Sequence, residues 1–129
     1  MPIRIKDIDH IVLRVRDVDR SIHFFCQVLS CSMDRARPEI GLYHLRAGRA
    51  LIDLVDAKDD AQTSSATNMD HFALQVEPFN ETEIRAHLAA HNITVDKTGE
   101  TYGALGVGPA LYIEDPDGNV VELKGPPSD

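Results

Sequence analysis

Two segments of the chain alternate apolar and polar residues in nearly the same order. Asp9–Val15 reads DHIVLRV, and Asp70–Val76 reads DHFALQV. Alternation with β-branched or aromatic residues is typical of a β-strand, in which side chains two positions apart share one face of the sheet. The pattern therefore predicts two equivalent strands, each carrying one histidine, His10 or His71, at the same position.

The residues that follow the first strand predict a helix and three more strands. Asp17 is suited to cap a helix N-terminus, and apolar residues then recur with helical spacing over about 18–30. This apolar stripe consists of Ile22, Phe25, Cys26 and Leu29. Short strands are predicted at about 32–37, 41–46 and 50–55. The first half therefore has the predicted order β-α-β-β-β.

The second half repeats this order after a polar linker at 56–68. A strand at 70–76 precedes a helix at about 81–91, where Asn80 and Glu83 have capping-box spacing. The remaining predicted segments are a strand beginning at 93, a glycine-rich loop over 99–108, a strand at 109–114, a turn at 115–119 and a last strand at 120–124. We therefore predict one domain over residues 1–129, formed by an internal duplication with modules at 7–56 and 69–125.

Composition and charge narrow the classes of function. An apolar content of 43% suits a compact globular domain, and the apolar runs are too short to span a membrane or to form a signal peptide. The formal net charge of −8, without clusters of Lys and Arg, argues against binding to nucleic acid. We expect a cytoplasmic protein in which Cys26 and Cys31 are reduced.

Each half also places one carboxylate in its apolar fourth strand, Asp53 in the first half and Glu122 in the second. Burying an acid is costly unless a partner compensates its charge, and a divalent cation does so well. Two imidazoles and two carboxylates suit Zn²⁺, Ni²⁺, Mn²⁺ or Fe²⁺. We therefore predict His10, Asp53, His71 and Glu122 as metal ligands. The alternative is that the histidines are hydrogen-bonded structural residues and that Asp53 is a solvated residue of an edge strand.

The other histidines carry weaker signals. His87 and His91 are four residues apart on the second predicted helix, a spacing that can bind a metal, but an exposed helix face explains them more simply. His23 lies opposite the apolar stripe of the first helix. The pattern around His44 indicates no function.

These segments together resemble the vicinal oxygen chelate superfamily, which includes glyoxalase I, fosfomycin-resistance proteins, bleomycin-binding proteins and extradiol dioxygenases. The resemblance extends from Asp9 to Lys124. Its best-matched pieces are 9–17, 20–25 with 28–29, 70–74 and 112–123, the last of which reads YIEDPDGNVVEL.

The resemblance implies an α+β fold in which two repeated βαβββ modules form a half-open barrel around a metal. Within the superfamily the chain looks most like the short glyoxalase I type, lactoylglutathione lyase. In that type a histidine on the first strand and a glutamate on the fourth strand of each module bind the metal, and Asp53 departs from this pattern by being one methylene shorter. The first-strand arginine that helps to bind a glutathione carboxylate corresponds to Arg14. The resemblance also implies a homodimer with its sites at the interface.

The predicted function is a metal-dependent lyase that isomerises the hemithioacetal of a 2-oxoaldehyde and a thiol, with glutathione as the expected co-substrate, through an enediolate. Glu122 is the first choice for the residue that moves the proton from C1 to C2, and Asp53 is the second. Three alternatives remain open from the sequence: addition of a thiol or water to an epoxide antibiotic, an extradiol dioxygenase, and a binding protein of the bleomycin-resistance kind without catalytic activity.

Overall fold

A computed structural model of the chain describes residues 2–58, 68–114 and 118–128. The chain divides into two compact units, one formed by His10–Asp70 and the other by Met1–Asp9 with His71–Asp129. Most of the predicted linker, and positions 115–117 of the predicted turn, lie outside the described residues.

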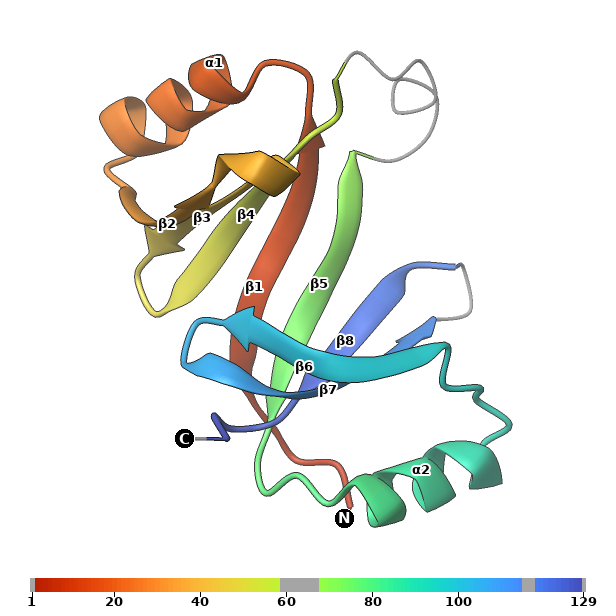
Figure 1. Cartoon of the computed structure of the whole chain (residues 1–129). Coiled ribbons are helices and arrows are strands. Elements are labelled where there is room, and N and C mark those ends of the chain that lie inside the picture. The colour runs from red at the N-terminus through yellow and green to blue at the C-terminus, as the bar shows by residue number, and fades with distance from the viewer. Residues whose placement is uncertain (1, 59–67, 115–117, 129) are drawn as a thin grey trace. The chain divides into compact units, whose positions relative to one another are not determined.

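The unit His10–Asp70 has a four-stranded mixed sheet with the order β2-β3-β4-β1. The outermost pairs, β2 with β3 and β3 with β4, are antiparallel, and β4 is parallel to β1. Its elements are β1 (Ile5–Val15), which begins in the other unit, α1 (Val18–Ile22), the π-helix η1 (His23–Val28), β2 (Ser32–Arg37), the 3-10 helix η2 (Pro38–Ile40), β3 (Leu42–Ala47) and β4 (Ala50–Asp56) (Figure 1).

The first helix begins as predicted but does not continue as one α-helix. Asp17 caps α1 by accepting a hydrogen bond of 3.0 Å from the backbone N–H of Arg20. From His23 the chain forms a π-helix, in which the backbone N–H of Leu29 donates to the carbonyl of Phe24. The wider turn changes which side chains share a face, and Leu29, predicted to be buried, is 55% exposed. The predicted apolar stripe is therefore wrong at its C-terminal end.

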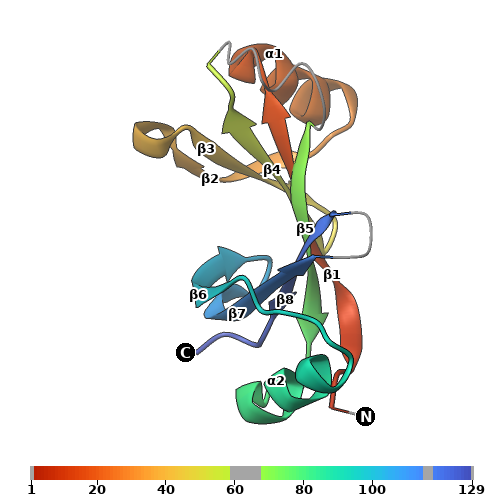
Figure 2. The same ribbon diagram turned by 90° about the vertical axis from the view of Figure 1, so that its right-hand side faces the viewer.

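The second unit has the same β-α-β-β-β order, and its mixed sheet has the order β5-β8-β7-β6. Strand β5 is parallel to β8, and β6, β7 and β8 are successively antiparallel. Its elements are β5 (Met69–Val76), α2 (Glu81–Ala90), β6 (Lys97–Gly103), β7 (Gly106–Glu114) and β8 (Val120–Lys124). Figures 1 and 2 show the β6–β7 hairpin from two sides, with α2 beyond the end of β5.

The two faces of this second sheet differ in chemistry. On one face, Ile84 and Leu88 of α2 pack against apolar strand residues. The buried members of this core are Val76, Ile84, Leu88, Leu111, Val121 and Leu123. Because side chains alternate along a strand, Glu122 and Lys124 of β8 point to the opposite face. The hydrophobic core thus forms one side of the sheet, and buried polar groups collect on the other.

Two predictions in the second half are wrong. Ile93 and Val95 do not belong to a strand; they pack against the core from a segment without regular structure, and β6 begins at Lys97. Residues 99–108 are not a loop but most of the β6–β7 hairpin. A Cβ atom at Gly103 would overlap the Asp9 carboxylate and the Lys124 side chain, so this glycine serves the close approach of neighbouring groups within a strand.

The remaining elements agree with the sequence. The strands predicted at 32–37, 41–46, 50–55 and 120–124 and the helix at 81–91 are all present within a residue or two. The predicted α+β fold, with two repeated βαβββ modules, is therefore confirmed. No helix in the described parts of the chain is long and apolar enough to cross a membrane.

Candidate metal centre

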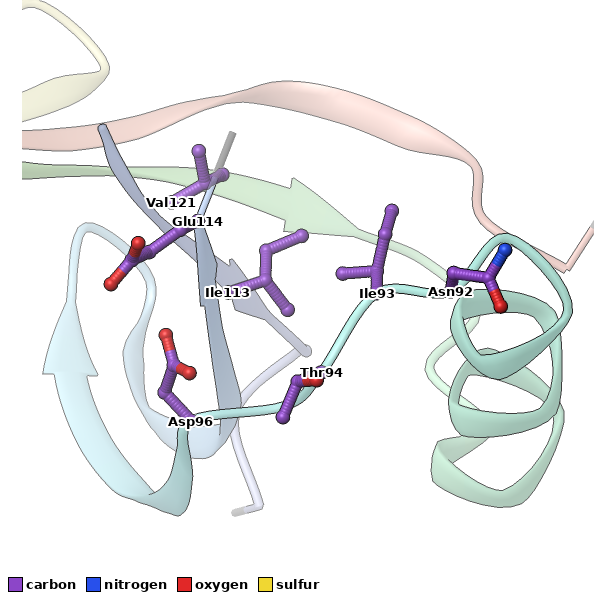
Figure 3. A pocket seen from close by; sticks show the side chains of 7 residues that line it. All are labelled: Asn92, Ile93, Thr94, Asp96, Ile113, Glu114 and Val121. Atoms are coloured by element: carbon purple, nitrogen blue, oxygen red, sulfur yellow. The ribbon is translucent and has the colours of Figure 1, made fainter. Parts of the chain in front are cut away.

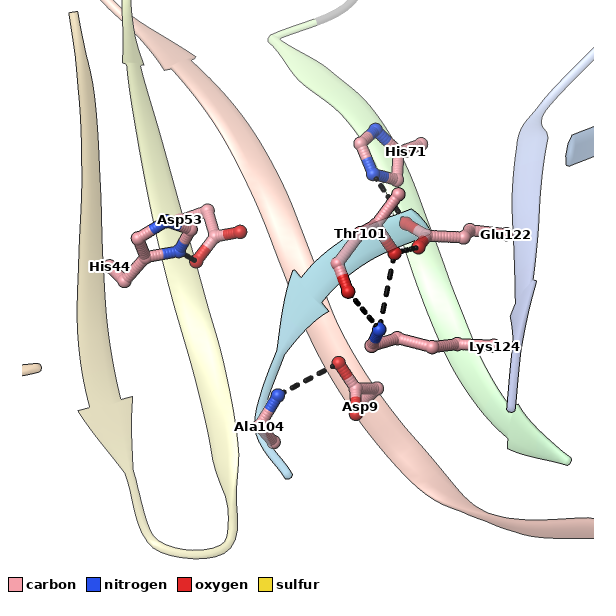
Figure 4. A network of polar contacts seen from close by, with 8 residues as sticks. All are labelled: Asp9, His44, Asp53, His71, Thr101, Ala104, Glu122 and Lys124. Atoms are coloured by element: carbon pink, nitrogen blue, oxygen red, sulfur yellow. Dashed lines mark hydrogen bonds and ion pairs between the residues drawn. The ribbon is translucent and has the colours of Figure 1, made fainter. Parts of the chain in front are cut away.

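Two of the four predicted metal ligands lie together on the polar face of the second sheet. Ala73 pairs with Glu122 across β5 and β8, and His71, two residues before Ala73, shares its face. The His71 Nε2 atom lies 3.1 Å from Oε1 of Glu122 (Figure 4). The Glu122 side chain is 1% exposed and that of His71 14%. A nitrogen and a carboxylate oxygen, both of types that divalent metals accept, therefore meet in a nearly solvent-free position.

The other oxygen of Glu122 is held by residues that the sequence reasoning missed. The Thr101 hydroxyl donates to Oε2 of Glu122 at 2.7 Å. The Lys124 ammonium donates to the Thr101 carbonyl oxygen and, at 3.2 Å, to its hydroxyl oxygen (Figure 4). Lys124 could have been found because it lies two residues after Glu122 on the same strand face. Thr101 was hidden because its segment reads as a loop.

Asp9 belongs to the same buried network. One of its carboxylate oxygens accepts a hydrogen bond from Gln75 Nε2 at 2.8 Å, and the other accepts from the backbone N–H of Ala104 at 3.1 Å. Asp9 is 1% exposed. Burial lowers the pKa of the Lys124 ammonium, while the carboxylates of Glu122, Asp9 and Glu100 act in the opposite direction. The buried Lys124 ammonium and the buried carboxylates of Asp9 and Glu122 thus compensate one another.

The aromatic ring of Tyr112 lies against the His71 imidazole. Tyr112 of β7 pairs with Glu122 of β8 and therefore points to the same face. Its ring meets that of His71 edge to face, with 5.5 Å between the ring centroids. The Lys97 ammonium lies 4.6 Å from the centre of the Tyr112 ring. The contact with Tyr112 restricts the orientations open to the His71 imidazole.

The unit His10–Asp70 carries the other two predicted ligands on one face of its sheet. Val12 pairs with Asp53 across β1 and β4, and His10 lies two residues before Val12. This is the same arrangement as that of His71, Ala73 and Glu122 in the second module. His10 and Asp53 are each 3% exposed. The register thus places the two acids at equivalent positions of the repeat, as the sequence alignment of the two halves predicts.

Asp53 has a close partner that the sequence reasoning dismissed. His44 of β3 lies opposite Asp53 of β4, and its Nδ1 atom is 2.7 Å from Oδ1 of Asp53 (Figure 4). Both side chains are at most 5% exposed. A short β3–β4 connection at Gly48, whose φ of 65° suits glycine, sets this register. Counting outward from the short connection between the strands predicted at 41–46 and 50–55 would have placed His44 opposite Asp53.

The predicted substrate-binding residue, Arg14, lies on β1 in the same unit. Its guanidinium is 3.8 Å from the Asp70 carboxylate, and its side chain is 30% exposed. A positive group with this exposure is accessible to an anionic ligand. Its role in binding a substrate stays a prediction.

A pocket of about 580 Å³ lies on a different part of the second unit. It is lined by Asn92, Ile93, Thr94, Asp96, Ile113, Glu114 and Val121 (Figure 3). Ile113 and Val121 alternate along their strands with Tyr112 and Glu122, so they belong to the apolar face of the sheet. The pocket is therefore separate from the His71–Glu122 pair.

The family model of the Glyoxalase/Bleomycin resistance protein/Dioxygenase superfamily matches residues 7–123. The chain belongs to this superfamily, as its resemblance to the vicinal oxygen chelate proteins predicts.

Individual relatives differ in activity. The chain is 28% identical over 114 residues to a catechol-2,3-dioxygenase of Bacillus subtilis, covering 86% of this chain and 38% of the relative. The chain thus spans well under half the length of this curated relative.

Solved structures share the fold at low identity. Methylmalonyl-CoA epimerase of Mycobacterium tuberculosis matches with a TM-score of 0.69 at 16% identity, covering 95% of this chain and 89% of that one. The Mn(II)-bound glyoxalase of Novosphingobium aromaticivorans matches with a TM-score of 0.72 at 18% identity, covering 98% of this chain and 42% of that one. These similarities establish the glyoxalase-like fold.

Proposed function

We propose that His10, His71 and Glu122 bind a divalent metal ion and that the protein is a metal-dependent enzyme acting on a small molecule with two adjacent oxygen atoms. The observation that carries this proposal is the buried His71–Glu122 pair, with 3.1 Å between Nε2 and Oε1. Two imidazoles and one carboxylate fit Ni²⁺, Zn²⁺, Mn²⁺ or Fe²⁺. The solved Mn(II)-bound glyoxalase of the same fold agrees with this class of cofactor.

The inclusion of His10 rests on the repeat and on its neighbour in the chain. His10 occupies in the first module the position that His71 occupies in the second. It directly follows Asp9, which shares a compact unit with His71 and Glu122 and is bonded there to Gln75 and Ala104. The Cα atoms of Asp9 and His10 are only about 3.8 Å apart. We therefore propose His10 as the third ligand.

The reaction we propose is that of a glyoxalase I-like lyase, which isomerises the hemithioacetal of a 2-oxoaldehyde and a thiol such as glutathione. A bound divalent metal would polarise the two adjacent substrate oxygens and favour loss of the C1 proton. Glu122 takes this proton and returns it at C2, and its burial keeps water away from the transfer. Arg14 supplies a positive charge for a carboxylate of the thiol substrate.

Asp53 has a different place in this proposal. Its Oδ1 atom is occupied by His44, so we assign the metal to three residues. The roles of Asp53 as a fourth ligand and as a second proton carrier stay predictions from the sequence. A set of two histidines and one carboxylate is also the ligand set of iron-dependent oxygenases. This observation favours an extradiol dioxygenase, acting on a catechol, as the second candidate function.

We also propose that the protein is a homodimer. Phe24, Val28 and Leu29 of the first helical segment are between 48% and 59% exposed. Large apolar side chains exposed next to one another mark surfaces that bind other proteins. Sedimentation measurements over a range of protein concentrations test this, and a monomer at all concentrations would contradict it.

The decisive experiment combines metal analysis with two assays on the same full-length protein. Elemental analysis first gives the bound metal, and the protein is then stripped and reloaded with Ni²⁺, Zn²⁺, Mn²⁺ or Fe²⁺. Each form is assayed with the methylglyoxal–glutathione hemithioacetal and, under oxygen, with catechol. Metal-dependent isomerisation supports the lyase, and ring cleavage by the Fe²⁺ form supports the dioxygenase. A protein that binds none of the four metals would overturn the proposal and favour a binding protein of the bleomycin-resistance kind.

A further inference from the structure

The hydrogen bonds around Thr101 have a fixed direction. The Lys124 ammonium carries only donors, so its 3.2 Å contact with the Thr101 hydroxyl uses an oxygen lone pair. The hydroxyl has a single hydrogen, which is then directed to Oε2 of Glu122 at 2.7 Å. The order of donation is therefore Lys124 to Thr101 to Glu122, and Oε2 is held as an acceptor.

The two oxygens of Glu122 consequently have different surroundings. Oε2 accepts from Thr101, while Oε1 faces His71 Nε2 at 3.1 Å. Glu122 is completely buried, and a carboxylate in such a position retains its rotamer as long as its hydrogen-bond partners hold it. The carboxylate can therefore offer Oε1 to a metal without rotating, whereas offering Oε2 requires breaking the bond to Thr101.

Lys124 is itself fixed in place. Its ammonium also donates to the Thr101 backbone carbonyl, which ties it to β6 independently of the hydroxyl. The side chain is 2% exposed, and the absence of a side chain at Gly103 leaves the room it occupies. A lysine buried to this extent requires compensation of its charge, which the neighbouring acids Asp9 and Glu122 supply. The series of hydrogen bonds from Lys124 through Thr101 to Glu122 therefore begins at a side chain that is held in place.

We propose that Thr101 and Lys124 are positioning residues that make Glu122 a ligand through one oxygen, Oε1, and keep Oε2 away from the metal. This inference rests on the proposed function, because it specifies how Glu122 binds the proposed ion. It also leaves Oε2 of Glu122 outside the coordination sphere, with a second lone pair that can accept a proton. Outer partners of metal ligands commonly act in this way.

The test uses the full chain loaded with Co²⁺, whose visible absorption reports the number and geometry of its ligands. Thr101→Val keeps the shape of the side chain and removes the hydroxyl. We expect metal affinity to fall by about 10–100-fold, because Glu122 loses an outer partner that positions it. We also expect the Co²⁺ spectrum to change, because Oε2 becomes free to join or replace Oε1. Thr101→Ser retains the donor and should restore both the affinity and the spectrum.

Two further variants complete the experiment. Thr98→Val is the matched control, since Thr98 is an exposed residue of the same strand on the opposite face; it should bind Co²⁺ as the wild type does. Lys124→Met removes the ammonium that donates to Thr101 and keeps a side chain of similar length, so it is used if Thr101→Val does not fold. It should produce the same kind of spectral change.

The outcomes separate the two proposals. A wild-type protein that binds no Co²⁺, Zn²⁺, Ni²⁺, Mn²⁺ or Fe²⁺ overturns the proposed function and this inference with it. A wild type that binds metal, together with folded Thr101→Val or Lys124→Met protein of unchanged affinity and spectrum, overturns the inference alone. Loss of affinity in Thr101→Val that Thr101→Ser does not restore also overturns it, because the effect would then not depend on the hydroxyl.

Discussion

His44 and Asp53 face each other across β3 and β4, with His44 Nδ1 2.7 Å from Asp53 Oδ1 and both side chains nearly inaccessible to solvent. The position of His44 in the first module corresponds to that of Tyr112 in the second, since each lies opposite the acid of its fourth strand. The two modules therefore use equivalent positions differently. In the first, the acid is bonded to the third strand; in the second, it is bonded to Thr101 of β6 and lies close to His71 of β5.

The first prediction concerns this pair. Asp53→Asn replaces a charged acceptor in a buried hydrogen bond, and we expect it to lower the free energy of unfolding by about 1–3 kcal/mol. A double-mutant cycle with His44→Gln should give a coupling energy of about 0.5–3 kcal/mol, because the effects on stability of substituting two residues in contact are not additive. Urea denaturation of the wild type, the two single variants and the double variant measures this coupling energy. Additive unfolding free energies would contradict the interaction of His44 with Asp53. The same Asp53→Asn protein, titrated with Zn²⁺, tests Asp53 as the predicted fourth metal ligand. An unchanged Zn²⁺ affinity would contradict that role.

The second prediction concerns the metal and thermal stability. A ligand that binds the folded state stabilises it by about 2.7 kcal/mol at a concentration of 100 times Kd. We therefore expect Zn²⁺ to raise the melting temperature of the wild type and a chelator to reverse this rise. His71→Ala and Glu122→Gln should abolish the rise, and Glu122→Gln should also abolish turnover.

His91→Ala serves as the control, because His91 is an exposed residue at the end of α2. It should respond to Zn²⁺ as the wild type does. A Glu122→Gln protein that retains full activity would contradict the assignment of the catalytic residue.

The third prediction concerns the core of the second unit. Leu111 is completely buried against α2 and its neighbours. Leu111→Ala leaves a cavity and should lower the free energy of unfolding by about 2–5 kcal/mol. Leu105, in the turn between β6 and β7, is 49% exposed; Leu105→Ala should change stability by less than about 0.5 kcal/mol. If chemical denaturation finds equal losses of stability for the two substitutions, Leu111 does not belong to the hydrophobic core.

The fourth prediction concerns the start of α2. The Asn80 side chain accepts a hydrogen bond of 3.0 Å from the Glu83 backbone N–H and donates one to the Glu83 carboxylate. Asn80→Ala should lower stability by about 0.5–2 kcal/mol, because a helix N-terminus loses its cap. Asn80→Asp keeps the acceptor and should retain most of this stability. If thermal denaturation finds Asn80→Ala as stable as the wild type, the cap contributes nothing to folding.

The sequence by itself determined the repeat and most of its elements. The alternation in Asp9–Val15 and Asp70–Val76 requires strands with one histidine each, because the period of two in a strand fixes which side chains share a face. The capping residues Asp17 and Asn80 fixed where the helices begin, since these residues act through backbone groups only a few positions away. Local rules of this kind need no knowledge of the rest of the fold.

The tertiary structure decided the partners of each polar group. His44 meets Asp53 across the directly paired strands β3 and β4, whereas Thr101 of β6 meets Glu122 of β8 on one face of a sheet in which β7 lies between those two strands. Strand pairing sets such contacts, and a shift of one residue turns every side chain to the other face. The glycines of β6 made its segment read as a loop, although Gly103 is there to admit the side chains of Asp9 and Lys124. Which residue types were present followed from the sequence; which of them touch followed from strand register and packing.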